Sequence, residues 1–282
     1  VTVSYNYDSA NRLKSIVNGG GKTYSYQYDN AGRRINLSYP NGAAANYSYD
    51  ISGRLLNLVH KTSSGSVITQ YSYTHDKVGN RLSKSEPDLK QTYSYDSIYR
   101  LIQAMPTKLN GKDKEQEHKA ETFTYDLLGN RQTGPKSLIS YEYNQGNQLT
   151  ERSKLEHGEE EPKAGYSYDR NGNLIKKLEY DDDGQIKKTT LYSYDYENRL
   201  IRVEIRKDNK AKIVSFTYDP LGRRLSKTVH REEIDDDEKD DEERELPRTT
   251  YYLYDNDNII LEYNQHGKVR AKYVHGRGID EH

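Results

Sequence analysis

The chain has 282 residues, a net charge of −1 at pH 7, 31% charged residues and 32% hydrophobic residues. So small a net charge creates no global field that would draw the chain to nucleic acid or to an anionic membrane. Because no run of about 18 apolar residues occurs, we expect no membrane-spanning helix. Cysteine is absent, which excludes a disulfide scaffold and cysteine-ligated metal sites. The low hydrophobic content is typical of disorder, but 28 tyrosines indicate a folded, thin protein in which amphipathic rings replace a deep aliphatic core.

A Tyr-x-Tyr-Asp motif recurs from the first residues onward. Complete copies lie at Tyr5/Tyr7/Asp8, Tyr26/Tyr28/Asp29, Tyr47/Tyr49/Asp50, Tyr93/Tyr95/Asp96, Tyr166/Tyr168/Asp169, Tyr192/Tyr194/Asp195 and Tyr252/Tyr254/Asp255. Copies with one change lie at Tyr73/His75/Asp76, Phe123/Tyr125/Asp126, Tyr141/Tyr143/Asn144 and Phe216/Tyr218/Asp219. The mean period is about 25 residues, which predicts a repeat array whose units bury surface against their neighbours.

Each unit is interpreted as a β-hairpin. Alternate tyrosines of one copy fall on one face of a strand. The Asp then opens a turn that ends in Gly, as at Asp29 to Gly32, because Asp is favoured at the first turn position and Gly at the last. A second strand follows, as at residues 33–39 or 54–61. The residues that recur in these turns include Gly53, Arg54, Gly129, Gly222 and Arg223.

Eleven units of two strands predict about 22 strands in a single array over residues 1–282. A sheet of that many strands twists and curls. We therefore predict an all-β fold: a long antiparallel β-hairpin repeat ribbon that curls into a spiral shell, without helices. Since the tyrosines share a face and a register, we also expect rings of neighbouring units to stack in cross-strand ladders.

The largest interruption of the repeat is an acidic loop at residues 231–245. Dense like charge is typical of a solvated, mobile loop, so we expect this segment to be dispensable for the fold. Binding of a cation or a basic partner is the alternative.

Residues suited to chemistry are present, but their pattern argues against a catalytic site. The repeated Asp occupies a turn position in every copy, so we expect it to cap its turn and to pair with the Arg that follows. The histidines lack metal-binding spacing, and no Gly-x-Ser-x-Gly nucleophile motif occurs. We therefore predict no catalytic residue, no metal site and no cofactor, and a protein that is not an enzyme. Asn36 and Asn46 fit the glycosylation sequon, a pattern that often arises by chance.

The unit Tyr47-Ser-Tyr-Asp-Ile-Ser-Gly-Arg-Leu55 resembles the YD repeat of the Rhs family. This family includes bacterial Rhs polymorphic toxins, wall-associated proteins, the C component of insecticidal toxin complexes, and animal teneurins. The resemblance covers nearly the whole chain. Residues 273–281 look like the end of an Rhs core, although Gly276-Arg277-Gly278 stands where the family usually has Gly-Pro-Gly.

The resemblance implies a segment of a larger β-sheet cocoon, secreted or on the cell surface, that encloses or displays a C-terminal toxin or other cargo. The family's self-cleavage motif would lie beyond Glu281. An alternative is an adhesion-type module that recognises glycans or a surface protein through exposed Tyr, Asn and Asp. Strand edges at residues 1–7 and 273–280 are expected to allow self-association.

Overall fold

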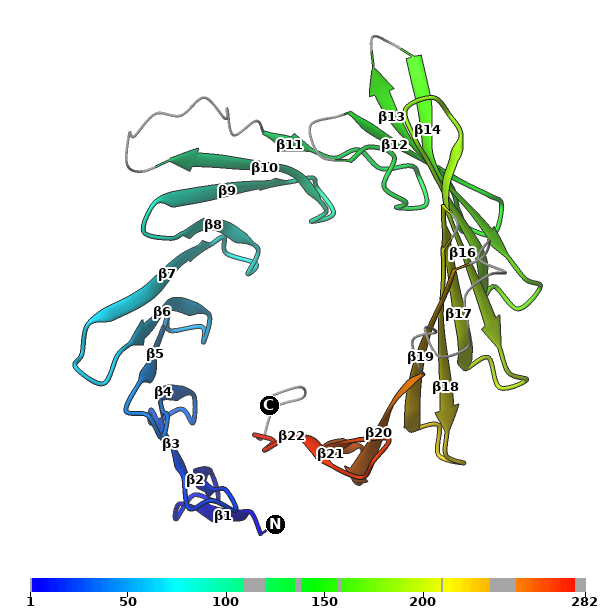
Figure 1. The fold of residues 1–282 in the computed structure, drawn as a ribbon. Coiled ribbons are helices and arrows are strands. Elements are labelled where there is room, and N and C mark those ends of the chain that lie inside the picture. Colours follow the sequence, from blue (N-terminus) through cyan, green and yellow to red (C-terminus); the bar gives the residue numbers. More distant parts are fainter. Residues whose placement is uncertain are drawn as a thin grey trace. The chain divides into compact units, whose positions relative to one another are not determined.

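The computed structural model describes residues 2–108, 120–134, 138–156, 159–208, 210–233 and 247–276. These residues form 22 strands and no helix (Figure 1). The prediction of an all-β fold is confirmed, and the strands form two antiparallel sheets of 11 strands each. One sheet lies in a unit that contains Val1–Thr124 and the other in the unit Tyr125–His275.

The first sheet, drawn from blue to blue-green in Figure 1, contains its strands in chain order. They are β1 (Ser4–Tyr7), β2 (Leu13–Val17), β3 (Thr23–Tyr28), β4 (Arg34–Ser38), β5 (Ala44–Tyr49), β6 (Leu55–Lys61), β7 (Val67–His75), β8 (Arg81–Ser85), β9 (Leu89–Tyr95), β10 (Leu101–Lys108) and β11 (Glu121–Thr122). Each strand pairs with the strands before and after it in the sequence. The first sheet is therefore a succession of hairpins that begins with β1 and ends with β11.

The second sheet has the same topology. Its strands are β12 (Ile139–Tyr143), β13 (Leu149–Glu156), β14 (Glu159–Tyr168), β15 (Leu174–Tyr180), β16 (Ile186–Tyr194), β17 (Leu200–Lys207), β18 (Lys210–Tyr218), β19 (Arg224–Glu233), β20 (Arg248–Asp255), β21 (Asn258–Asn264) and β22 (Val269–Lys272). The predicted acidic loop begins within β19, and its residues 234–245 lie outside the described residues.

Most of the hairpin turns share one backbone geometry. In the turn after β5, the N–H of Asp50 donates to the carbonyl of Arg54 at 2.9 Å, and the N–H of Gly53 donates to the carbonyl of Asp50 at 3.0 Å. Gly53 has a φ of 83°, and the strand register shifts by one residue between Ser48 and Tyr49. This is a type I turn followed by a left-handed residue that forms a bulge. The left-handed position requires Gly or Asn in most copies, because a side chain with a Cβ is strained there.

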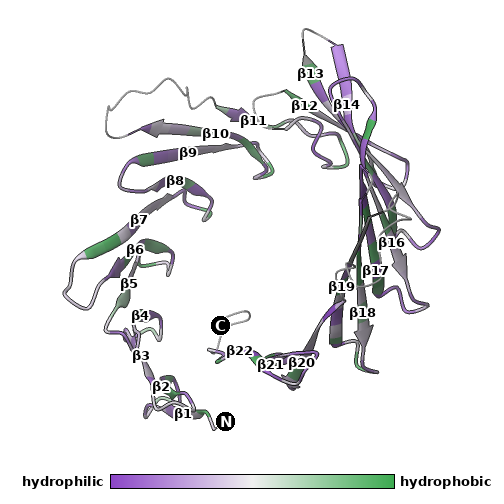
Figure 2. Cartoon of the chain, in the orientation of Figure 1, coloured by the Kyte–Doolittle hydropathy of each residue, from purple (hydrophilic) through white to green (hydrophobic). Residues whose placement is uncertain are grey.

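Few side chains are fully buried. The buried apolar residues of the first sheet are Leu13, Ile16, Tyr26, Leu37, Ala45, Ala104 and Phe123, and those of the second sheet are Ala164, Ala211 and Val214. Most other strand residues that face the tyrosine side are half-buried. Figure 2 shows hydrophilic and hydrophobic segments mixed within both sheets. The fold therefore depends on half-buried tyrosine and polar contacts as well as on aliphatic packing.

Candidate functional site

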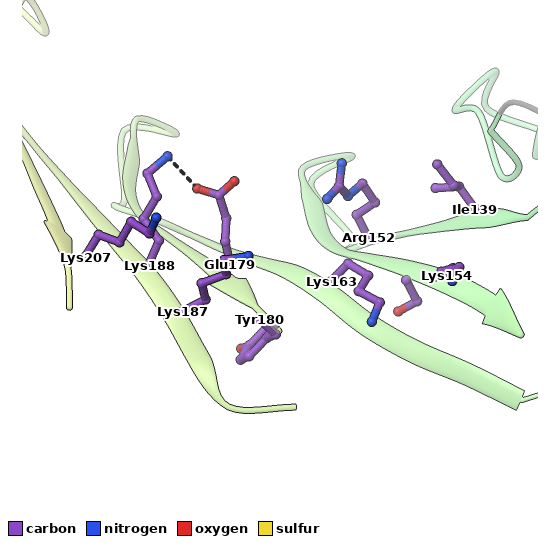
Figure 3. A pocket seen from close by; sticks show the side chains of 10 residues that line it. Ile139, Arg152, Lys154, Lys163, Glu179, Tyr180, Lys187, Lys188 and Lys207 are labelled. Atoms are coloured by element: carbon purple, nitrogen blue, oxygen red, sulfur yellow. Dashed lines mark ion pairs between the residues drawn. The ribbon is translucent and has the colours of Figure 1, made fainter. Parts of the chain in front are cut away.

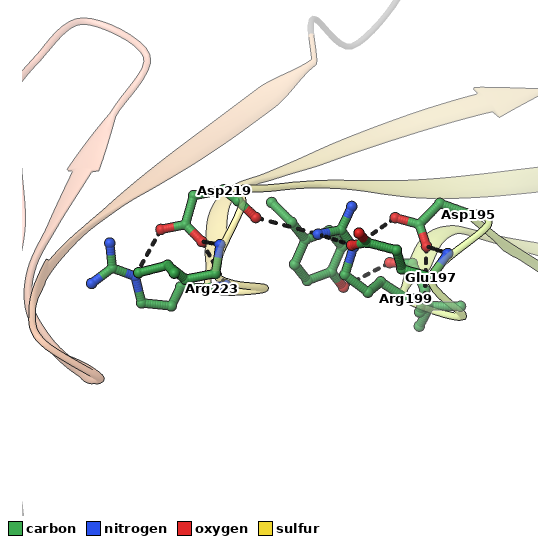
Figure 4. Close-up of polar contacts among 8 residues, drawn as sticks. Asp195, Glu197, Arg199, Asp219 and Arg223 are labelled. Atoms are coloured by element: carbon green, nitrogen blue, oxygen red, sulfur yellow. Dashed lines mark hydrogen bonds and ion pairs between the residues drawn. The ribbon is translucent and has the colours of Figure 1, made fainter.

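The repeated Asp caps its turn in a constant way. At Asp29, one carboxylate oxygen accepts hydrogen bonds from the backbone N–H groups of Ala31 at 3.0 Å and Arg33 at 2.9 Å. The other oxygen accepts from the Nε of Arg33 at 2.6 Å. Figure 4 shows two further turns of this kind, at Asp195 and Asp219. The same ion pair recurs at Asp8/Arg12, Asp50/Arg54 and Asp96/Arg100.

Three turns carry Asn in place of this Arg. At Asp76, Asp126 and Asp169, the Nδ2 group of the Asn four residues later donates to the carboxylate at 2.8–2.9 Å. The cap is kept, but the positive charge is absent. The turns therefore fall into a charged class, which has an Asp–Arg ion pair, and a second class in which a neutral Asn side chain replaces the Arg.

The Arg of a charged turn also reaches the next hairpin. The Nη1 of Arg33 donates to the backbone carbonyl of Asp50 at 2.8 Å, and the Nη1 of Arg199 donates to that of Asp219 at 3.3 Å (Figure 4). One guanidinium thus holds its own turn and the following turn together. Because Arg presents five donors in a rigid fork, it can make both contacts at once.

The second Tyr of the motif completes the connection between hairpins. The hydroxyl of Tyr49 donates to the backbone carbonyl of Arg34, in the preceding unit, at 2.8 Å. The same bond joins Tyr28 to Leu13, Tyr95 to Arg81, Tyr143 to Arg131, Tyr168 to Leu149, Tyr194 to Leu174, Tyr218 to Leu200 and Tyr254 to Arg224, at 2.7–3.0 Å. We call the set formed by the capping Asp or Asn of one turn, the Arg, Asn or Gln four residues later, and this Tyr of the next unit a clasp.

Arginine also packs on the tyrosine rings. The guanidinium carbon of Arg33 lies 5.1 Å from the ring centre of Tyr49, and that of Arg34 lies 4.8 Å from the ring centre of Tyr47. Equivalent contacts join Arg12 to Tyr28, Arg199 to Tyr218 and Arg223 to Tyr254. An arginine thus lies against each of these rings, whereas Tyr24 and Tyr39 contact each other edge to face, with ring centres 6.4 Å apart. Such cation–π contacts contribute about 0.5–1 kcal/mol each at exposed sites.

The remaining predicted repeat residues lie in less regular surroundings. Tyr5 and Tyr7 lie in the edge strand β1 and are 43% and 52% exposed. Tyr125 forms an isolated bridge with Arg131, and Asp255 pairs directly with Asn258 in a tighter turn.

The tyrosines in the first position of the motif have varied surroundings. Tyr26 is buried, and Tyr93 donates to the side chain of Gln91 at 3.0 Å. Tyr166, Tyr192 and Tyr252 lie opposite Lys177, Val203 and Glu262, respectively. Gly129 and Gly222 occupy the left-handed turn position, with φ of 90° and 81°.

His75 occupies the position of the clasp tyrosine in β7. Its Nδ1 is buried and has no hydrogen-bond partner. A shorter imidazole therefore leaves this link between hairpins incomplete.

The ionisation of the clasp follows from these contacts. The hydrogen bond from the backbone N–H of Arg33, followed by that from its guanidinium, holds the pKa of Asp29 below the ordinary value of 3.8. Burial of the ring raises the pKa of Tyr49 above the ordinary value of 10.0, and burial does the same for Tyr95, Tyr143, Tyr168, Tyr194 and Tyr254. At neutral pH the Asp is therefore a charged acceptor and the Tyr a neutral donor, as the hydrogen bonds require.

Two other features are absent from the described residues. Nowhere in these residues do three or more His, Asp or Glu side chains come together as they would around a metal ion. The same part of the chain contains no helix long and apolar enough to cross a membrane.

A second feature is a groove of about 600 Å³ on the second sheet (Figure 3). It is lined by the cationic residues Arg152, Lys154, Lys163, Lys187, Lys188 and Lys207 together with Ile139, Ser153, Glu179 and Tyr180. The groove could not be predicted from the sequence, because its residues are spread over six strands. The sequence does show closely spaced basic residues at 187–188 and at 152 and 154. Only the strand register shows that these two groups lie on one face of the sheet.

Comparison with known proteins agrees with the repeat pattern. The Teneurin YD-shell profile matches residues 80–236, which is more than half of the chain. The chain belongs to the Rhs/YD-repeat family. The RHS Repeat profile additionally matches residues 7–44 of this YD-repeat chain.

Among the relatives of this YD-repeat chain is the tRNA3(Ser)-specific nuclease WapA of Bacillus spizizenii, 28% identical over 74% of the chain. The double-stranded DNA deaminase toxin A of Burkholderia cenocepacia is 31% identical over 58%. The chain spans only 7% and 10% of the length of these relatives. A solved structure of TcdB2-TccC3-TEV has a TM-score of 0.37 at 16% identity, covering 97% of this chain and 17% of that chain. A structure of TcdB2-TccC3 has a TM-score of 0.36 at 13% identity.

Proposed function

We propose that the chain is a wall segment of a larger Rhs-like shell, secreted or on the cell surface, that encloses or displays a C-terminal cargo. The observation that carries the proposal is the clasp, which recurs in both sheets and joins neighbouring hairpins. A shell wall requires that neighbouring hairpins stay attached to one another along the whole ribbon, whereas an enzyme requires a cleft at one place. Hydrogen bonds of this kind contribute about 0.5–1.5 kcal/mol each, and their repetition lets a sheet with little aliphatic filling stay ordered.

The same proposal takes residues 1–282 as one YD-repeat array and gives the array no catalytic activity of its own. The acids of the turns support this role, because their oxygens are engaged by backbone N–H groups and by Arg or Asn side chains. A carboxylate held in this way is stabilised as an anion and is a poor proton donor or acceptor near neutral pH. The activities in the names of the relatives would then belong to other parts of those longer proteins.

Protease protection tests the enclosure. A polypeptide that carries this array followed by a C-terminal region is digested before and after denaturation of the shell. We expect the C-terminal region to survive only while the shell is folded, and the same region expressed alone serves as the control. Equal cleavage of the enclosed and the isolated region would contradict the proposal.

Activity assays test the structural role. The 282-residue chain is incubated with tRNA and with double-stranded DNA, the substrates in the names of the relatives. We expect neither cleavage nor deamination above the rate in buffer. Turnover that disappears on substitution of a residue within the array, with the fold retained, would show that the array itself is catalytic.

A further inference from the structure

The groove on the second sheet is built from strand register. Arg152 of β13, Ala164 of β14, Glu179 of β15 and Lys188 of β16 lie directly opposite one another. Residues paired in this way share one face of an antiparallel sheet. At about 4.8 Å between strands, the span from β13 to β17 is about 19 Å. Ala164 is fully buried in this row, so the larger side chains on either side of it form the surface of the groove.

The groove has a strong excess of positive charge. Six cationic side chains line it, and Glu179 is the one carboxylate among the lining residues. Figure 3 shows the ion pair between Lys188 and Glu179, whose atoms are 2.8 Å apart. Lys163 contacts Asp182 at 2.9 Å and Glu161 at 3.1 Å. The lysines of the groove thus already bind carboxylates directly.

Three of the cations have no such partner among the described residues. No ion pair in that part of the chain involves Arg152, Lys187 or Lys207. Lys187 and Lys207 are also exposed. These three charges come from β13, β16 and β17. They are available to an incoming anion along the length of the groove.

We propose that this groove binds an acidic polypeptide segment in extended conformation. An extended chain rises about 3.4 Å per residue, so about six residues span the groove. Carboxylates of the segment would pair with Arg152, Lys187 and Lys207, while the ring of Tyr180 and the side chain of Ile139 contact its apolar atoms. The site lies apart from the clasps and does not depend on the enclosure of a cargo.

The lining favours an acidic polypeptide over nucleic acid. Single-stranded nucleic acids bind to grooves that offer successive aromatic platforms for their bases, and Tyr180 is the one aromatic residue in the lining. The contacts seen in the groove, to Glu179, Asp182 and Glu161, are all to carboxylates.

The test uses the 282-residue chain and a fluorescein-labelled hexaglutamate peptide, with binding followed by fluorescence anisotropy. We expect saturable binding that weakens as salt is added, because the charges are partly exposed. The double variant Lys187→Glu/Lys207→Glu should weaken binding about tenfold, since two attractive contacts become repulsive. Lys14→Glu/Lys77→Glu is the matched control, because it makes the same change in net charge at exposed lysines of the first sheet.

Circular dichroism verifies that both variants keep the β fold. A hexalysine peptide should not bind. An equal loss of hexaglutamate binding in the two double variants would overturn the proposal, because the attraction would then be unspecific. The proposal also fails if a labelled single-stranded oligonucleotide binds more tightly than hexaglutamate and loses its binding in Lys187→Glu/Lys207→Glu.

Discussion

Leu13 and Ile16 in the first sheet are only 2% and 1% exposed, whereas the buried apolar side chains of the second sheet are Ala164, Ala211 and Val214. The second sheet instead carries ion pairs along its strands, such as Lys188 with Glu179 and two arginines with Glu204. Its longest strands also have ten residues, against nine in the first sheet. The turns and clasps are common to both sheets. The same type of hairpin connection therefore occurs in a sheet with large buried aliphatic side chains and in a sheet with ion pairs between strand side chains.

Alkaline pH should disrupt the clasps, which both sheets contain. Burial raises the pKa of the clasp tyrosines above 10.0 in both sheets. Their contribution to stability is then fully present below pH 10 and is lost as the pH rises through the higher folded-state values. We expect cooperative loss of β structure above pH 10, together with tyrosinate absorbance in the ultraviolet. Complete tyrosine ionisation with unchanged circular dichroism would contradict this.

Ile16→Ala should affect the first sheet alone. Replacing a fully buried Ile by Ala lowers the free energy of unfolding by about 2–5 kcal/mol. Because repeat units pack mainly against their neighbours, we expect this loss in the first sheet only. Ile201→Ala in β17 is the control, because Ile201 is 36% exposed and surface changes usually stay within about 0.5 kcal/mol. Amide hydrogen exchange, resolved by strand, measures both effects, since an array of repeats need not unfold in one step. Equal effects of the two substitutions would remove the proposed difference between the sheets.

Tyr49→Phe removes one clasp hydrogen bond and leaves the ring in place. The carbonyl of Arg34 then loses its donor, so we expect a loss of about 1 kcal/mol, seen as faster exchange in β4 and β5. Tyr7→Phe is the matched control, because Tyr7 lies exposed in the edge strand β1. A loss of the same size in the control would mean that the hydroxyl contributes by some route other than the clasp.

His75→Tyr should restore a link that the first sheet lacks. The substitution removes a buried Nδ1 without a partner and supplies a hydroxyl at the position that completes the clasp in other units. We expect a gain of about 1 kcal/mol, measured as slower exchange in β6 and β7. His60→Tyr, a change of the same kind outside the motif position, is the comparison. Destabilisation by His75→Tyr alone would show that the pocket around His75 does not admit the larger ring.

Glu204→Gln gives the smallest expected effect and tests the charged filling of the second sheet. Arg202 and Arg206 both contact Glu204 and hold the pKa of Glu204 below its ordinary value of 4.5. Such partly exposed pairs contribute at most about 1 kcal/mol each. The loss should shrink as salt is added, and exchange in the first sheet should not change. If the loss of stability did not depend on salt, Glu204 would stabilise the sheet through packing and not through its charge.

Much of the turn chemistry could be predicted from the sequence, because it spans only five residues. Asp at the first position, Gly or Asn at the left-handed position and Arg or Asn at the last are local preferences. The clasp could not be predicted in the same way. Its tyrosine lies 15 residues after its acceptor at Tyr49 and 30 residues after it at Tyr254, so the partner depends on how long each intervening hairpin is. Register also decides what lies against a ring, which is an arginine at Tyr49 and another tyrosine at Tyr24.

The sequence by itself determined an all-β chain of repeated hairpins, because alternation along a strand and turn preferences are short-range properties. Only the tertiary structure decided which side chains meet across strands. Arg152, Glu179 and Lys188 become neighbours through three strand pairings, and a shift of one residue in any of them would turn one of these side chains to the other face. The basic groove and the clasps follow from that register, which is set by bulges and hairpin lengths acting together over the whole sheet.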